Sequence, residues 1–326
     1  MIRRPLYLGG PEVGVVGYGA MSFTNFYGDT TDEQSKTILD ACVDLGIDHI
    51  DTSNVYGMGR SETVIGEWLS SRGENPFFIA TKGGITRQPD RRFNNERAHL
   101  TEALEASLTR LGVEAVDLYY VHRRDPSVEV EEVAETLAGF VKAGKAKAVG
   151  FSEIAPTTLR RAQAVAPIQA VQSEYSLQTR SPEMGLTQTC DELGAAVVAF
   201  SPVGRGLLTD RPPSAEKAAG LDFLKGNPRF MEPNISANLQ VTEALRKLAA
   251  EMGVATATLA CAWCVAKGSF PIPGTRSVEH LRECVAGGAL DLSAEDVARI
   301  EAALPIGSVH GDRYSVGQWT GPERYC

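Results

Sequence analysis

Four side chains that can hold or move protons follow three neighbouring apolar segments of the sequence. Asp51 ends one segment and Tyr56 follows it closely, whereas Lys82 and His122 come at the ends of the next two. A tyrosine hydroxyl has an ordinary pKa of about 10, and a nearby ammonium lowers that pKa because it stabilises the phenolate. A carboxylate keeps such a lysine charged, and a neutral histidine can donate a hydrogen bond to a carbonyl oxygen. The set predicts a proton donor beside an oxyanion site.

Each of these residues also has an ordinary structural interpretation. Asp51 can cap a turn, and Tyr56 can be a core aromatic. Lys82 can lie on the surface, and His122 can be a hydrogen-bonded residue of the rim. Their meeting at one edge of the fold favours the functional interpretation. The set holds no obvious nucleophile, so proton transfer coupled to a second reagent is favoured over hydrolysis.

Eight short apolar segments alternate with helical patterns, and each is predicted to be a strand. Most are apolar nearly throughout, which is typical of parallel strands buried on both faces. The segments are Val13–Gly17, Ile47–Asp51, Phe77–Thr81, Val116–Val121, Ala146–Phe151, Ile168–Gln172, Ala196–Phe200 and Phe270–Ile272. This alternation predicts one α/β domain over residues 1–326, a (β/α)8 TIM barrel whose strand ends meet at one rim.

An open doubly wound sheet is the alternative fold. That fold normally carries Gly-x-Gly-x-x-Gly after its first strand, whereas Gly17 and Gly19 have no third glycine near them. Helix starts are predicted at two capping boxes, Thr31 to Gln34 and Ser293 to Asp296. The barrel is therefore favoured.

Three segments fall outside the strand–helix alternation. Residues 7–10, followed by Val13, predict an N-terminal β-hairpin at the barrel floor. Residues 203–234 form a long connection rich in Pro, Gly and Arg, and long βα loops at the C-terminal face are often functional. The tail from 305 to 326 can pack over the same face.

The later strand ends present groups suited to a cofactor. Ser152 and Gln172 can hold a carboxamide, and Phe200 offers a flat face to a heteroaromatic ring. Gly204 and Gly206 let backbone amides approach a pyrophosphate. Ordinary loop chemistry is the alternative for each of these residues.

A second phosphate site is predicted after the eighth segment. Ser277 can cap a helix that begins at Val278, and Arg276 precedes it. A helix N-terminus beside a guanidinium attracts phosphate. An ordinary surface arginine is the alternative.

The composition excludes several classes of protein. The chain of 326 residues has 41 acidic and 32 basic residues and a net charge of −9, which argues against nucleic acid or acidic membranes as partners. Apolar runs such as 259–266 are far shorter than the roughly 18 residues that cross a bilayer. No secretory signal is recognisable, so a cytoplasmic location is expected. Six cysteines are too sparse for a disulfide framework, and Cys261 and Cys264 are predicted to be packed core thiols, not ligands of a metal.

The motifs together resemble those of the aldo-keto reductases over nearly the whole chain. They are DTSNVYG (51–57), ATK (80–82), DLYYVH (117–122), GFS (150–152), VQSEYS (171–176), SPVGRG (201–206) and IPGT (272–275). The segments EYSL (174–177) and GDRY (311–314) are similar to those of the microbial and plant branch, which includes pyridoxal-reductase-like and auxin-induced-protein-like members.

The resemblance implies an NADPH-dependent reductase of small carbonyl compounds, built on a barrel that binds NADPH/NADP+ without a Rossmann fold. It implies Tyr56 as general acid, tuned by Lys82 and Asp51, with His122 orienting the carbonyl. The implied cofactor contacts are the carboxamide and ring partners Ser152, Gln172 and Phe200, the loop residues Ser201, Pro202, Gly204, Gly206 and Leu208, and the phosphate-end residues Gly274, Thr275, Arg276 and His280.

Three positions depart from the common family pattern. Many members have Asn at Glu153, Arg or Gln at His280, and Asn at Cys284. Two other functions stay open: an NADPH-binding regulatory subunit with slow chemistry, and a cofactor-free lyase that forms a Schiff base on Lys82. Aromatic residues are candidates for the substrate pocket, namely Phe23, Phe26, Tyr27, Phe93 and Trp319.

Overall fold

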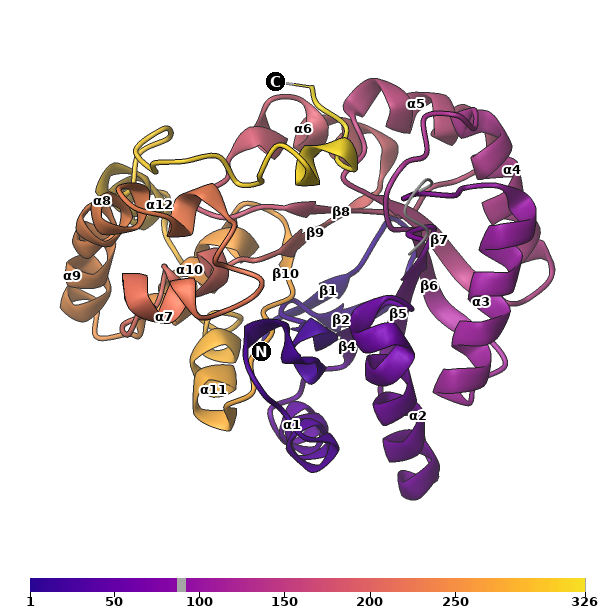
Figure 1. The fold of residues 1–326 in the computed structure, drawn as a ribbon, viewed down its shortest axis with the longest axis horizontal. Coiled ribbons are helices and arrows are strands. Elements are labelled where there is room, and N and C mark those ends of the chain that lie inside the picture. Colours follow the sequence, from indigo (N-terminus) through magenta and orange to yellow (C-terminus); the bar gives the residue numbers. More distant parts are fainter. Residues whose placement is uncertain (87–91, 326) are drawn as a thin grey trace.

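The computed structural model describes residues 1–86 and 92–325, and a parallel eight-stranded sheet forms its centre (Figure 1). Its strands are β3 (Tyr18–Gly19), β4 (His49–Asp51), β5 (Phe78–Gly83), β6 (Val116–Val121), β7 (Ala146–Ser152), β8 (Ala170–Glu174), β9 (Ala196–Phe200) and β10 (Phe270–Pro271). Sequential strands are neighbours in the sheet. The N–H groups of Gly17 and Gly19 donate to the carbonyls of Pro271 and Pro273, each at 3.0 Å, so the two edges meet. The predicted (β/α)8 barrel is confirmed.

Residues of one strand alternate between the inside of the barrel and the helix layer. On β6, Leu118 and Tyr120 belong to the cluster that fills the barrel, whereas Tyr119 and Val121 pack in the outer cluster. All four side chains are fully buried. Burial on both faces explains why the strand segments are apolar nearly throughout, since each buried Å² of apolar surface contributes about 25 cal/mol.

The N-terminal segment corrects one strand prediction. The hairpin is present, with β1 (Arg3–Pro5) antiparallel to β2 (Glu12–Gly14), but its second strand takes up the start of the apolar run 13–17. The first barrel strand is therefore Tyr18–Gly19 and not 13–17. The chain bends between the two, and a Cβ at Gly17 would lie 2.9 Å from the carbonyl oxygen of His49. Leu6 and Val13 pack into the interior cluster, so the hairpin closes the floor.

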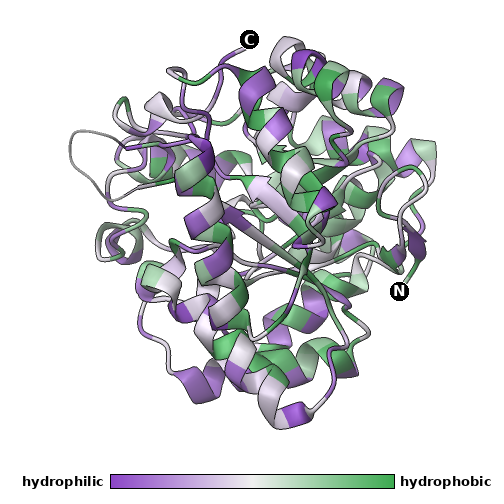
Figure 2. Ribbon diagram, turned by 90° about the vertical axis from the view of Figure 1, so that its right-hand side faces the viewer, coloured by the Kyte–Doolittle hydropathy of each residue, from purple (hydrophilic) through white to green (hydrophobic). Residues whose placement is uncertain are grey.

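Helices surround the strands, and hydrophobic and hydrophilic residues alternate along them (Figure 2), as one buried face requires. Helices α1 to α6 cover Asp32–Asp44, Arg60–Arg72, Arg97–Leu111, Val130–Lys142, Pro156–Val165 and Leu186–Leu193. Helices α7 to α12 cover Ala215–Ala219, Asn234–Val241, Glu243–Glu251, Thr256–Ala266, Val278–Ala286 and Ala294–Ala303. Both predicted capping boxes are present, at Thr31 and Ser293.

Two irregular segments lie at the C-terminal ends of the strands. The connection 203–234 contains α7 and packs around its own apolar cluster, which includes Leu207, Leu224 and Phe230. The tail, residues 305–325, crosses from the side of α12 to that of α5 and α6 (Figure 1). Its Glu323 N–H donates to the Glu153 carbonyl at 2.9 Å, so the tail is fixed beside the end of β7.

The apolar helix α10 is a core element. Its Cys261 and Cys264 are free and fully buried, as predicted. No single helix of the described residues has both the length and the hydropathy of a membrane span; residues 234–251 and 256–266 pass that test only as a pair bent by 91°.

Candidate active site

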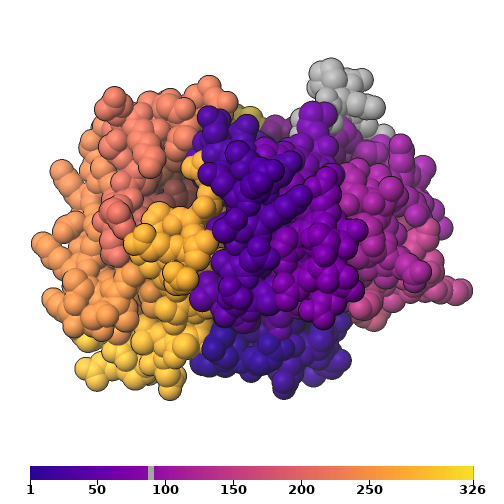
Figure 3. All heavy atoms as spheres, turned by 90° about the horizontal axis from the view of Figure 1, so that it is seen from below, coloured from indigo at the N-terminus to yellow at the C-terminus, as the bar shows by residue number. Residues whose placement is uncertain are grey.

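A cavity of about 820 Å³ opens among the C-terminal ends of the barrel strands. Strand ends, the connection 203–234, the start of α11 and the tail all contribute to its wall. Figure 3 shows a recess between the indigo N-terminal segment, the orange segment that includes α11, and the salmon connection. A volume of this size accommodates small molecules or cofactors, which typically occupy about 300–1,000 Å³.

Asp51, Tyr56 and Lys82 meet at one side of this cavity. The parallel register sets Asp51 beside Ala80, so Lys82 lies two residues further along β5. Lys82 Nζ forms an ion pair with Asp51 Oδ1, and it donates to the Thr52 carbonyl at 2.8 Å and to the Tyr56 hydroxyl at 3.3 Å. The Lys82 and Asp51 side chains are 0% and 2% exposed. The buried Lys82 and Asp51 are thus connected to Tyr56, which is partly buried at the cavity wall.

Burial and charge act in opposite directions on these groups. Burial lowers the pKa of the Lys82 ammonium, but Asp51 and Tyr56 raise it more, so the pKa lies above its usual value and the lysine stays charged. Burial raises the pKa of the Tyr56 hydroxyl, and Lys82 offsets this only in part. The expected lowering of the tyrosine pKa is therefore wrong for this structure, because removal from water outweighs the nearby ammonium.

His122 completes the group from the end of β6. Its Nδ1 lies 3.0 Å from the Ser53 hydroxyl, and its ring meets the Tyr56 ring edge-on with 5.8 Å between centroids. Burial, Arg123 and Lys82 all hold the pKa of His122 well below its usual value, so the imidazole is neutral. Sequence reasoning missed Ser53, although its place two residues after Asp51 was the available signal.

The predicted carboxamide and ring partners lie along the next part of the wall. Ser152, Gln172 and Phe200 all line the cavity. Gln172 Nε2 donates to Asp51 Oδ2 at 2.7 Å, and the Ser152 hydroxyl accepts from Arg123 at 2.9 Å. The structure therefore joins the predicted cofactor wall to the proton-donor group.

The glycine loop differs from expectation. The N–H groups of Gly204, Gly206 and Leu208 donate to carbonyls within their own turn, at 2.9, 3.0 and 3.1 Å. The Leu208 side chain is fully buried in the core, and neither it nor Gly204 lines the cavity, although Gly206 does. These three N–H groups therefore do not form the predicted binding site for a pyrophosphate, because each already donates to a carbonyl of the same turn.

The far end of the cavity brings together the predicted phosphate residues. Gly274, Thr275, Arg276 and His280 line the cavity there, and Ser201 and Pro202 of the predicted loop contacts line it as well. Ser277 caps α11 by accepting from the His280 N–H at 3.3 Å, as predicted. Arg276 donates to the Tyr27 carbonyl at 2.8 Å and to the Asp29 carbonyl. Both partners are neutral carbonyls, and no carboxylate of residues 1–86 or 92–325 forms an ion pair with Arg276.

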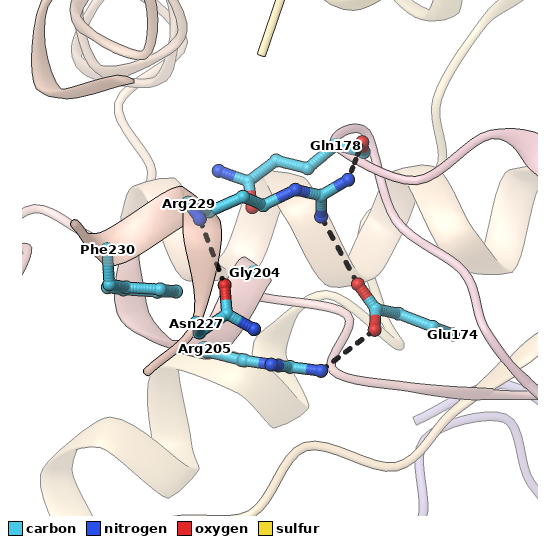
Figure 4. A pocket seen from close by; sticks show the side chains of 7 residues that line it. All are labelled: Glu174, Gln178, Gly204, Arg205, Asn227, Arg229 and Phe230. Carbon is cyan, nitrogen blue, oxygen red and sulfur yellow. Dashed lines mark hydrogen bonds and ion pairs between the residues drawn. The ribbon is translucent and has the colours of Figure 1, made fainter. Parts of the chain in front are cut away.

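A buried cluster of five charged residues connects the cavity to the tail, and sequence reasoning missed it. Glu174 contacts Arg205 at 3.0 Å and Arg229 at 3.2 Å (Figure 4), and Glu153 binds Arg313 through both oxygens. Glu153 thus holds the tail and is not among the residues that line the cavity. The partners are distant in sequence, so no local pattern signals these contacts.

Three of the five aromatic candidates for the substrate pocket line the cavity. Phe26, Tyr27 and Phe93 line the cavity, whereas Phe23 is buried away from it. Trp319 does not line the cavity either; the tail contributes Tyr314, Gln318 and Gly321 instead. Cys284 lines the cofactor end, in a buried cluster with Cys261.

Known proteins are similar to this chain in sequence and fold over nearly its full length. The Aldo/keto reductase family profile matches residues 15–305. An aldo-keto reductase of Schizosaccharomyces pombe, yakc [NADP(+)], is 35% identical over 319 residues, 95% of this chain and 94% of that protein. The probable aldo-keto reductase 1 of Glycine max is 38% identical over 321 residues, 96% of this chain and 92% of that protein. The solved glycerol dehydrogenase of Gluconobacter oxydans has a TM-score of 0.79 at 25% identity, covering 90% of this chain and 92% of that one.

Proposed function

Because the chain belongs to the aldo/keto reductase family of oxidoreductases, we propose that it reduces aldehydes or ketones to alcohols with NADPH. The observation that carries the proposal is the 3.3 Å contact between Lys82 Nζ and the Tyr56 hydroxyl at the cavity wall. This pair presents a proton and a fixed positive charge to an incoming carbonyl oxygen. The substrate is then a small carbonyl compound.

The donor set around the cavity fits a nicotinamide dinucleotide. The Ser152 hydroxyl oxygen accepts from Arg123, which leaves its own proton available for a carboxamide oxygen. Phe200 offers its ring from the end of β9. At the far end, Arg276 and the N-terminus of α11 supply positive charge for phosphate, which favours NADPH over NADH.

When bound, NADPH supplies the hydride that the carbonyl carbon receives. Tyr56 gives its hydroxyl proton to the carbonyl oxygen, so the C=O group becomes the C–OH of the alcohol. Lys82 stabilises the phenolate left on Tyr56, and Asp51 keeps Lys82 charged and in place. A positioned general acid of this kind contributes about 10²–10⁴-fold to the rate.

His122 orients the carbonyl oxygen as a neutral hydrogen-bond donor. For Nε2 to carry the proton, Nδ1 must be unprotonated, and the Ser53 hydroxyl then donates to it across 3.0 Å. The low pKa of His122 keeps it in this neutral form.

A Tyr56→Phe variant tests the proposal. NADPH oxidation is measured with a panel of aldehydes and ketones, and NADPH binding is measured by quenching of protein fluorescence. We expect kcat to fall at least about 10²-fold while the Kd for NADPH stays within about twofold. Full turnover by the variant would show that Tyr56 is not the proton donor. NADPH binding by the wild type without stopped-flow oxidation by any carbonyl compound would instead favour a regulatory subunit.

A further inference from the structure

Arg123 places a positive charge directly beside the proton-donor group. It follows His122 at the end of β6 and lines the cavity. Its Nη1 donates to the His122 carbonyl at 2.7 Å and to the Ser152 hydroxyl at 2.9 Å, and its Nη2 reaches the Tyr314 hydroxyl at 3.5 Å. These contacts hold the guanidinium between the carbonyl-binding residue and the tail.

No carboxylate in the described part of the chain balances the charge of Arg123. Its three hydrogen-bond partners are neutral, and no carboxylate of residues 1–86 or 92–325 forms an ion pair with it. The next residue, Arg124, lies 3.6 Å from Glu323, and the buried Arg205 and Arg313 contact Glu174 and Glu153. Arg123 therefore differs from its buried neighbours, because none of the described residues provides it with a counter-charge.

The surroundings of Arg123 strengthen its field. Near the proton donor the cavity wall includes apolar groups such as Val55, Ile85 and Phe93. The neighbouring acid there is Asp51, and both of its oxygens are already bound, to Lys82 and to Gln172. A cation in a partly enclosed apolar site attracts anions more strongly than one in open water.

We infer that the preferred substrates are aldehydes that also carry a carboxylate, which Arg123 binds while Tyr56 and His122 receive the carbonyl. Guanidinium is suited to this task because its planar donors match the two oxygens of a carboxylate. The aromatic residues Phe26, Phe93 and Tyr314 favour an aromatic frame between the two groups. This inference rests on the proposed reductase function and names its substrate class.

The test compares 4-carboxybenzaldehyde with 4-formylbenzamide, a neutral analogue of nearly the same shape. In the wild type we expect kcat/KM to be at least about tenfold higher for the carboxylate, mainly through a lower KM, because a charged hydrogen bond is worth roughly 1.5–3 kcal/mol. Arg123→Met should reduce this ratio to about one, and Arg123→Lys should keep part of it. Arg123→Met also removes the hydrogen bond to Ser152, which can lower kcat/KM for both aldehydes alike. The ratio of the two kcat/KM values is not affected by such a common loss.

Arg211→Met is the matched control. Arg211 also lines the cavity, but its guanidinium lies 3.4 Å from Glu279 at the α11 end, so its removal should leave the ratio unchanged. Raising the ionic strength should lower the wild-type ratio, because salt screens a partly exposed charge. A wild-type ratio of one or less, or an unchanged ratio in Arg123→Met, would overturn the inference.

A binding measurement separates this inference from the proposed function. Benzoate is titrated calorimetrically into the NADP+ complexes of the wild type and of Arg123→Met. We expect benzoate to bind the wild type at least about tenfold more tightly than it binds Arg123→Met. Equal affinities of the two proteins for benzoate would refute the anion site, even if neither protein reduced any aldehyde. If both aldehydes are inert but benzoate binding depends on Arg123, the reductase proposal fails while the anion site stands.

Discussion

Gln172 donates a hydrogen bond from Nε2 to Asp51 Oδ2 across 2.7 Å, although 121 residues separate the two in sequence. The other oxygen of the carboxylate pairs with Lys82. Asp51 therefore has both oxygens satisfied in a buried position, which fixes the ammonium that contacts Tyr56. Under the proposed function, stability and proton transfer thus depend on the same buried ion pair.

Lys82→Met is expected to abolish most activity and to destabilise the fold by about 3–5 kcal/mol, because it leaves the Asp51 carboxylate buried without its cation. Chemical denaturation measures the loss. The double variant Asp51→Leu/Lys82→Met removes both charges and should regain much of the stability but none of the activity. A double variant as unstable as the single one would contradict this account.

Ser53→Ala is expected to lower kcat about tenfold with little change in KM, because His122 loses the partner that selects its tautomer, a hydrogen bond worth roughly 1–1.5 kcal/mol. Ser173→Ala is the matched control: its hydroxyl is equally buried but has no hydrogen-bond partner among the described residues. Steady-state kinetics of both variants decide the matter. Equal effects would show that Ser53 has only a packing role.

The rate of carbonyl reduction is expected to show no inflection near pH 6.5, because burial, Arg123 and Lys82 hold the pKa of His122 well below that value. Arg123→Met removes one of these causes, so the acid limb of the kcat profile should move to higher pH. Rate profiles over the acid and neutral range measure this. A wild-type inflection at the ordinary histidine pKa would show that His122 is exposed to solvent.

His49 is expected to weaken the fold in acid. It is fully buried, neither ring nitrogen has a hydrogen-bond partner among the described residues, and burial lowers its pKa. The unfolded chain binds a proton there below about pH 6.5 while the folded chain does not, so stability is full above that pH and declines as the pH falls.

His49→Leu removes this titration. Its Tm relative to the wild type should therefore improve more at pH 5.5 than at pH 8, as calorimetry or circular dichroism would show. His310→Leu, at an exposed position, serves as the control. A Tm difference that does not vary with pH would contradict the assignment to His49.

The sequence predicted those features that depend on local or periodic patterns. Capping boxes are formed by residues three apart, and Thr31 and Ser293 begin helices as expected. Apolar segments located the barrel strands within about two residues, apart from β3. There the apolar run 13–17 continues through a bend, and apolarity alone does not tell a floor hairpin from a barrel strand.

Site residues that follow directly after strands could be predicted from the sequence. Contacts between segments that are distant in sequence could not. Asp51, Lys82 and His122 follow strands, so barrel geometry brings them together. The contacts of Glu153 with Arg313 and of Glu174 with Arg205 depend on loops and the tail. The direction of the Tyr56 pKa shift also required the structure, because it is set by the balance between burial and the Lys82 charge.

The tail that crosses the mouth of the barrel stands apart from the strand–helix repeat, yet it supplies Tyr314 to the cavity wall. The residues proposed to move the proton lie on the strand ends and in the turn after β4, outside this tail. Under the proposed function, substrate selectivity and proton transfer therefore depend on different parts of the chain. Natural or engineered variation in the last twenty residues can redirect which molecules are accepted while the underlying chemistry is inherited intact.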